Sequence, residues 1–210
     1  LTGKCNLNCK KYFKNNFLHQ VKKLCKKNNC LLIFDEVVTG FRYSIGGAQK
    51  LYGVTPDLSC FAKAISNGIP LSAVVGKKKY MKLFDEVFFS FTYGGECIGL
   101  AAAKACIEKI KDKKVLEVIK LNGYIFQTKL NNLINTYNLN DYFSCDGHPS
   151  RTVLTIKSYK FLKSALHIKT FIQQELLKNN ILWTGYHCIT YTFNKKDIQL
   201  ALIAYKKTFI

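Results

Sequence analysis

The feature that most constrains the fold is a short apolar run, LLIF at residues 31–34, which ends in two carboxylates, Asp35 and Glu36. A continuous apolar run of this length is typical of a strand buried on both faces. An amphipathic helical pattern over residues 15–28 precedes it. Two further strand candidates follow, LSCFAK and LSAVVG, and then a helical pattern over 97–111 opened by Gly94 and Gly95. This alternation predicts an α/β layer with a mostly parallel sheet.

The pattern changes after about residue 112. We expect a long helix that is broken near Gly123, and a final helix whose N-cap is Asn194. Between them we expect a strand at SRTVLTI, a helix at SALHIKTFIQQELLKN and a strand-like segment at ILWTGYHCITYTF. The sequence therefore predicts two domains, part of a larger one over 1–111 and a smaller α+β domain over 112–210.

The charge is high but dispersed. The 210 residues include 32 basic and 13 acidic side chains, a net charge of +19, and only two of the basic residues are arginine, Arg42 and Arg151. Lysines spread over helical faces indicate solvated surfaces, whereas a nucleic-acid surface would more often cluster its charge and use arginine. A hydrophobic fraction of 48% argues against disorder, and no apolar run is long enough for a membrane span.

Nine cysteines, an odd number, favour reduced thiols and a cytoplasmic location over a disulfide scaffold. Cys5, Cys9, Cys25 and Cys30 have a loose zinc-like spacing. However, Cys25 falls on the apolar stripe of the first helical pattern, so a core thiol is favoured there and no metal site is predicted.

Two ionisable residues stand out by their context. Asp35 lies at the carboxyl end of a predicted buried strand, where ligands of open α/β sheets bind. Lys63 is the sole charged residue between positions 58 and 76, and burial would lower its pKa and make its amine nucleophilic. In the alternative reading, Lys63 extends from a strand end into water and Asp35 caps a helix.

Together these residues form a wider pattern. The stretch from Leu31 to Gly68 contains Asp-Glu-Val, Gly-Phe-Arg, Pro-Asp-Leu and Ala-Lys, with 28 residues from Asp35 to Lys63. It resembles the class III aminotransferases that use pyridoxal phosphate. The segments GIPLSAVVGKKKYMKLF, FSFTYGGE and GYHCITYTF are most similar to the glutamate-1-semialdehyde aminomutase branch. The resemblance implies part of a fold-type-I pyridoxal-phosphate transferase large domain, followed by a small domain.

The resemblance also implies roles for four residues. Lys63 would form a Schiff base with the aldehyde of pyridoxal 5'-phosphate and then move a proton on the substrate. Asp35 would pair with the pyridine nitrogen and keep it protonated, and Val37, two residues further along the strand, would lie against the ring. Thr92 would bind the cofactor phosphate across the interface of a homodimer. The substrate would be a small amino or oxo compound.

Departures from the family pattern leave alternatives open. Ala62 and Phe91 stand where relatives often have glycine, and relatives carry roughly as much chain again before this point. The chain therefore resembles the carboxy-terminal half of such an enzyme, and a truncated or degenerate half-enzyme, inactive alone, is the alternative. Arg42 would either pair with an acidic neighbour or touch substrate, Arg151 is a second substrate candidate, and His187 is expected to be a hydrogen-bonded core histidine or to lie near the active site.

Overall fold

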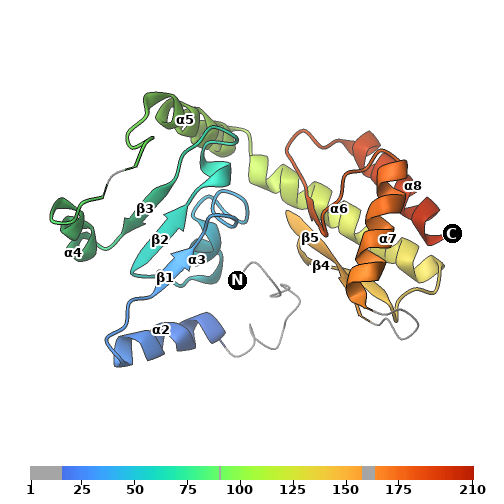
Figure 1. Ribbon diagram of the computed structural model, residues 1–210, viewed down its shortest axis with the longest axis horizontal. Helices are drawn as coiled ribbons and strands as arrows, with labels where there is room; N and C mark the ends of the chain where they lie inside the picture. The colour runs from blue at the N-terminus through green and yellow to red at the C-terminus, as the bar shows by residue number, and fades with distance from the viewer. Residues whose placement is uncertain (1–15, 90, 158–163) are drawn as a thin grey trace. The chain divides into compact units, whose positions relative to one another are not determined.

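The computed structural model describes residues 16–89, 91–157 and 164–210 (Figure 1). This part of the chain divides into two compact units, one ending at Leu116 and the other beginning at Glu117. Each unit has its own sheet, and each is described separately below.

The sheet of the first unit has three strands in the order β1 (Ile33–Asp35), β2 (Leu58–Phe61) and β3 (Ala73–Gly76). All three strands were predicted, and the α/β class is confirmed. β1 and β2 are parallel, as predicted, whereas β2 and β3 are antiparallel. The reversal follows from the short connection between β2 and β3, whose one helical element is the 3-10 turn η1 (Lys63–Ile65), since a parallel return needs a longer crossover.

Helix α2 (Phe17–Lys27) packs on one face of β1 through a core cluster of Leu18, Leu32, Phe34 and Val54. The opposite face of β1 is open in this unit, because Leu31 and Ile33 are 45% and 54% exposed. The prediction that this strand is buried on both faces was therefore wrong for the described chain, and its burial alternates residue by residue.

The other helical elements of this unit are α3 (Gly47–Tyr52), α4 (Lys78–Met81), the 3-10 turn η2 (Lys82–Asp85) and α5 (Cys97–Asp112). α5 covers η1 and the end of β2, in a cluster built on Phe61, Ile65 and Ala103. Its first turn is capped by the Glu96 carboxylate, which accepts the backbone N–H groups of Ile98 and Gly99. A side-chain cap, rather than the two preceding glycines, therefore begins this helix.

The second unit contains α6 (Val115–Thr136), β4 (Phe143–His148), β5 (Arg151–Ile156), α7 (Ala165–Lys178), β6 (Tyr186–Cys188) and α8 (Lys195–Phe209), with α6 beginning just before the division. The strands form an antiparallel sheet in the order β4-β5-β6. The predicted strand, the two later helices and the Asn194 cap are confirmed, and the cap is a full capping box with Asp197.

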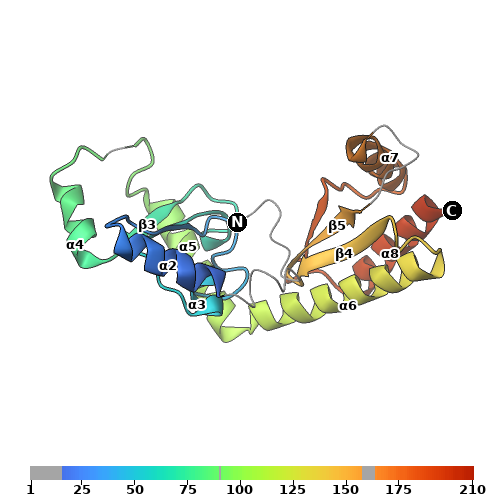
Figure 2. The same cartoon turned by 90° about the horizontal axis from the view of Figure 1, so that it is seen from below.

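Helix α6 runs beside β4 (Figure 2). The Asn131 side chain accepts the Cys145 N–H at 2.8 Å and donates to the Cys145 carbonyl at 2.9 Å. A helix thus satisfies backbone groups of β4 that the neighbouring strand does not pair. The apolar face of α6 is almost fully buried, with Phe126, Leu130 and Ile134 at most 2% exposed.

The predicted break near Gly123 was wrong, because α6 continues through it from Val115 to Thr136. A Cβ atom at Gly123 would lie 1.9 Å from the carbonyl oxygen of Pro149. Glycine is therefore required here by close packing of the helix on the β4–β5 turn, and not because the helix ends.

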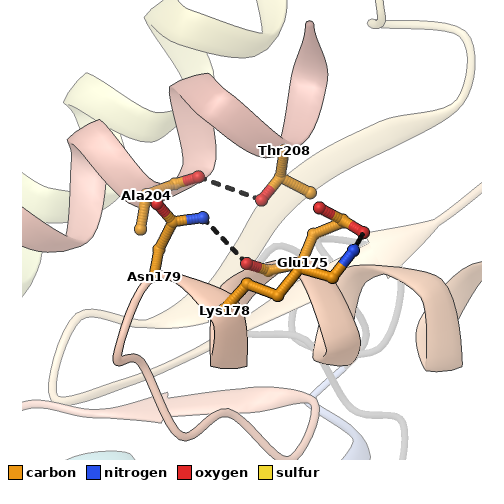
Figure 3. Close-up of polar contacts among 5 residues, drawn as sticks. All are labelled: Glu175, Lys178, Asn179, Ala204 and Thr208. Atoms are coloured by element: carbon orange, nitrogen blue, oxygen red, sulfur yellow. Dashed lines mark hydrogen bonds and ion pairs between the residues drawn. The ribbon is translucent and has the colours of Figure 1, made fainter.

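The ends of α7 and α8 are stabilised by local polar contacts (Figure 3). Asn179 donates from its side chain to the Glu175 carbonyl at 2.9 Å, and Thr208 donates to the Ala204 carbonyl at 2.9 Å. Lys178 pairs with the Glu175 carboxylate at 2.7 Å. Glu175 is one of the last four residues of α7, whose carbonyls lack partners within the helix, and the Asn179 side chain supplies that partner.

Candidate active site at the carboxyl ends of β1 and β2

Asp35 and Lys63 lie at the same edge of the sheet. Asp35 is the last residue of β1 and is in register with Cys60 of the parallel strand β2. Lys63 follows Cys60 by three residues, as the first residue of η1. Because β1 and β2 are parallel neighbours, about 4.8 Å apart, Asp35 and Lys63 both lie at the carboxyl ends of adjacent strands. This is the edge at which ligands of α/β sheets bind.

The sequence predicted neither the exposure of the Lys63 side chain nor the conformation of its backbone. Its side chain is exposed, so the sequence argument from burial does not apply. Its backbone has φ +47°, in the left-handed region that costs a non-glycine residue about 1 kcal/mol. Of the other described non-glycine residues with positive φ, all but Phe41 and Lys114 are asparagines, which tolerate this region well. Such strain concentrates at functional sites.

Asp35 is held by the turn that follows it. Its Oδ1 atom accepts the backbone N–H of Val37 at 2.9 Å, and among the described residues its Oδ2 atom has no partner. β1 ends at Asp35, so Val37 lies in a turn and not in the strand. The strand alternation that predicted the direction of Val37 therefore does not reach it, and its contact with a ring stays a prediction.

The sequence reasoning missed the structural role of Glu36, which is 1% exposed. Its carboxylate accepts the backbone N–H groups of Ala48 at 2.7 Å and Gln49 at 2.8 Å, together with the Thr39 hydroxyl. A buried carboxylate needs such donors. Glu36 thus fixes the loop after Asp35 to the first turn of α3. Its N–H still pairs with the Cys60 carbonyl of β2 at 2.9 Å, so alternation from Phe34 reaches Glu36 and was the signal that its side chain points inward.

The fit of Glu36 depends on Gly47, and we predict that Gly47→Ala destabilises the protein by about 3 kcal/mol. Gly47 has φ +72°, and a Cβ atom there would lie 2.4 Å from the Glu36 Oε2 atom. Gly53 is the matched control, because it has φ +67° but nothing within 4 Å of the added atom. Gly53→Ala should cost only about 1 kcal/mol. Equal losses for the two variants in urea unfolding would contradict the proposed role of Glu36.

The remaining motif residues fix the two strand ends. A Cβ atom at Gly40 would lie 2.4 Å from the Phe61 ring, and the rings of Phe41 and Phe61 meet edge to face at 5.7 Å. Asp57 accepts the Leu32 N–H at 2.9 Å and pairs with Lys77 at 2.6 Å, and these bonds, the Leu32 one first, lower its pKa. The Gly-Phe-Arg and Pro-Asp-Leu motifs therefore position β1 and β2.

Thr92 lies in an exposed turn before α5. The Gly94 N–H donates to the Phe91 carbonyl at 2.9 Å, so it is already engaged within this turn. The flanking segment is apolar and exposed, with Val87, Phe88, Phe89, Phe91 and Tyr93 between 50% and 97% exposed. The described residues therefore give Thr92 no partner element within this unit.

The two arginines and His187 have different surroundings. Arg42 is half-buried in the loop after Thr39. The Arg151 guanidinium lies 4.2 Å from the centre of the Tyr186 ring, a cation–π contact. His187 has both ring nitrogens hydrogen-bonded, to Thr152 at 2.9 Å and to Tyr205 at 2.6 Å, which confirms a hydrogen-bonded histidine.

The sequence left two interpretations of Cys25, a core thiol and a zinc ligand, and the described residues allow part of this comparison. Cys25 packs against the Leu18 cluster, as expected of a core thiol, whereas Cys5 and Cys9 lie outside the described residues. Over residues 16–89, 91–157 and 164–210, no group of three His, Cys, Asp or Glu side chains could hold a metal ion. The helices of the same residues include none with the length and apolar character to cross a membrane.

Solved structures define the fold. A transaminase with pyridoxal phosphate bound matches with a TM-score of 0.84 at 22% identity, over 91% of this chain and 46% of that one. An omega-transaminase from Sphaerobacter thermophilus matches with a TM-score of 0.82 at 20% identity, over 92% of this chain and 47% of that one. The chain therefore has the fold of one half of these transaminases.

Sequence comparison then gives the family. Residues 11–142 match the family described as Aminotransferase class-III, and the chain belongs to it. A 3-aminobutyryl-CoA aminotransferase of Cloacimonas acidaminovorans is 34% identical over 93% of this chain and 47% of its own length. A glutamate-1-semialdehyde 2,1-aminomutase of Nitrosopumilus maritimus is 44% identical over 56% of this chain and 29% of its own. The chain spans about half the length of the relatives that it matches over most of its own length.

Proposed function

We propose that the protein is a pyridoxal-phosphate enzyme that transfers an amino group, as an aminotransferase or a glutamate-1-semialdehyde 2,1-aminomutase. The observation that carries the proposal is the register of Asp35 with Cys60, which brings Asp35 and Lys63 to one edge of the sheet. Both side chains are exposed there, so a small ring can reach both. Family membership and the names of the relatives support the same chemistry.

The two residues fit this cofactor by their chemistry. The Lys63 amine would bind the aldehyde as a Schiff base, and once displaced by a substrate amine it would move a proton between the substrate carbon and the aldehyde carbon of the cofactor. The Asp35 carboxylate has an oxygen without a partner among the described residues, and it would hold the proton of a pyridine nitrogen. When bound, the cofactor supplies an electron sink for the carbanion that forms when a proton leaves the substrate.

We further propose that the units form part of a large domain (1–111) and a small domain (112–210), and that the active protein is a cytoplasmic homodimer. The exposed aromatic segment around Thr92 supports the dimer, because an apolar patch of this kind marks an interaction surface. In the dimer, Thr92 would bind the phosphate of the neighbouring site. The seven described free cysteines support a reducing compartment.

The test detects a covalent lysine adduct and does not require catalytic turnover. The protein is mixed with pyridoxal phosphate and reduced with borohydride, and the modified lysine is identified by peptide mass mapping. We expect one dominant adduct, on Lys63, which Lys63→Ala abolishes. Lys50→Ala, at an exposed lysine of α3, is the matched control and should leave the adduct on Lys63 unchanged.

The alternative is a half-enzyme that keeps the fold but has lost the chemistry. The partial coverage of its relatives is the observation that favours it. In that case the label would scatter over many of the exposed lysines and would be equal in the parent protein and in Lys63→Ala. This outcome would overturn the proposed enzymatic function.

A further inference from the structure

A cysteine thiol of α5 holds the turn η1, of which Lys63 is the first residue. The Cys106 Sγ atom donates to the Ala64 carbonyl oxygen at 3.3 Å. Burial raises the pKa of this thiol above its usual value, and the neighbouring Lys109 opposes the shift to a smaller extent. The thiol is therefore protonated at neutral pH and can act as the donor.

The Ala64 carbonyl depends on this thiol for its hydrogen bond. Within the same turn, the Ala62 carbonyl accepts the Ile65 N–H at 3.2 Å, and the Lys63 carbonyl accepts the Asn67 N–H at 3.0 Å. Among the described residues, no backbone N–H donates to the Ala64 carbonyl. A short helical turn leaves carbonyls without partners at its end, and the thiol supplies the donor that the backbone does not.

The backbone of Lys63 needs such support. Its φ of +47° lies in the left-handed region, which is unfavourable for a residue with a Cβ atom. A backbone in this region persists when the contacts around it determine its conformation. Two contacts with α5 do so here, since Ile65 is 8% exposed and packs with Ala103, and Cys106 holds the Ala64 carbonyl.

The position of α5 against this loop is itself fixed. Gly99, Ala103 and Cys106 are spaced four and three residues apart, so they share one face of the helix. A Cβ atom at Gly99 would lie 3.0 Å from the Pro70 carbonyl oxygen, so the helix approaches the loop closely at this point as well. The face that carries the thiol therefore contacts the loop at more than one place.

We propose that Cys106 is a positioning residue for Lys63, whose thiol fixes the backbone from which the Lys63 amine reaches the aldehyde of the cofactor. The inference rests on the proposed function, because it is in that chemistry that the position of the amine matters. Cys106 acts through the turn, by its bond to Ala64. Reactions between oriented groups are sensitive to displacements of about 1 Å, so a loosened turn should lower the reactivity of the amine.

Three variants separate the hydrogen bond from packing. Cys106→Ala removes the donor, whereas Cys106→Ser keeps a donor on a side chain of nearly the same shape. Ile107→Val is the matched control, because Ile107 packs on the same cluster of α5 and η1 and its change leaves the thiol in place.

The first readout is the adduct that pyridoxal phosphate and borohydride form on Lys63, divided by the adduct on the exposed Lys50 of the same protein sample. We expect this ratio to fall about threefold in Cys106→Ala, as the loss of one weak hydrogen bond predicts. It should stay close to the parent value in Cys106→Ser and in Ile107→Val. An equal fall in Cys106→Ala and Ile107→Val would show that packing alone is responsible and would overturn the proposal.

The second readout needs no cofactor. Hydrogen exchange of the Asn67 N–H, which donates to the Lys63 carbonyl, should become about threefold faster in Cys106→Ala and not in Cys106→Ser. Faster exchange with an unchanged adduct ratio would mean that the thiol is structural only, and unchanged exchange would mean that it does not hold the turn. Either result overturns the positioning role while the parent protein still labels on Lys63. Labelling scattered over many lysines in the parent protein would instead overturn the proposed function, and the positioning role with it.

Discussion

Gly123→Ala is expected to destabilise the protein by about 3 kcal/mol, although the same change in most helices is stabilising. Alanine has a higher helix propensity than glycine by about 1 kcal/mol, so an open site would gain stability. At Gly123 the added Cβ atom would lie 1.9 Å from the Pro149 carbonyl oxygen, which is backbone and cannot rotate away. Either α6 or the β4–β5 turn must therefore move.

The measurement is urea unfolding of the variant and the parent protein. Asn132→Ala is the control, because Asn132 is an exposed residue of the same helix whose side chain makes no hydrogen bond within the described structure. It should gain about 0.5 kcal/mol from helix propensity alone. A Gly123→Ala protein as stable as Asn132→Ala would show that the helix does not pack on Pro149 as described.

Gly123 also shows why part of the fold could not be predicted. A glycine within an apolar helical pattern is equally consistent with a helix break and with a close contact to another element. The residue that contacts Gly123 lies 26 positions away, in the β4–β5 turn. β4 was missed because its sequence, FSCDGH, has neither an apolar run nor clean alternation. By contrast, the Asn194 cap and the strands β1, β2 and β5 were predicted correctly, because their signals are local.

Some features of the candidate site could likewise be predicted from the sequence, and others could not. The sheet edge shared by Asp35 and Lys63 could be predicted, because two successive strand candidates each ended at one of these residues. The environment of Lys63 could not, since an apolar sequence around a lysine does not determine whether its amine is buried. The bonds of Glu36 to α3 depend on the path of a loop with two left-handed residues, Phe41 and Gly47, which the sequence pattern does not specify.

The second large expected effect is a loss of folding stability at low pH, caused by His187. Burial lowers the pKa of this ring from 6.5 to about 3, so below pH 6.5 the unfolded chain binds a proton that the folded protein does not. His187 should therefore reduce stability as the pH falls from 6.5 towards 3, by about 1.4 kcal/mol for each pH unit, and should have no effect above pH 6.5. The cause is visible in the hydrogen bonds. A protonated ring donates from both nitrogens, which leaves the Tyr205 hydroxyl, on a residue 1% exposed, without its acceptor.

The prediction is tested by urea unfolding between pH 6.5 and about pH 5, above the range in which most carboxylates titrate. Over this range His187 should account for a loss of about 2 kcal/mol, and His187→Gln should remove that part of the slope, because glutamine takes up no proton. His167→Gln, at an exposed histidine of α7, is the control and should leave the slope of the parent protein unchanged. If His187→Gln and the parent protein lose stability in parallel, the ring is protonated in the folded state, and the hydrogen-bonded chain from Thr152 to Tyr205 is not the neutral arrangement described above.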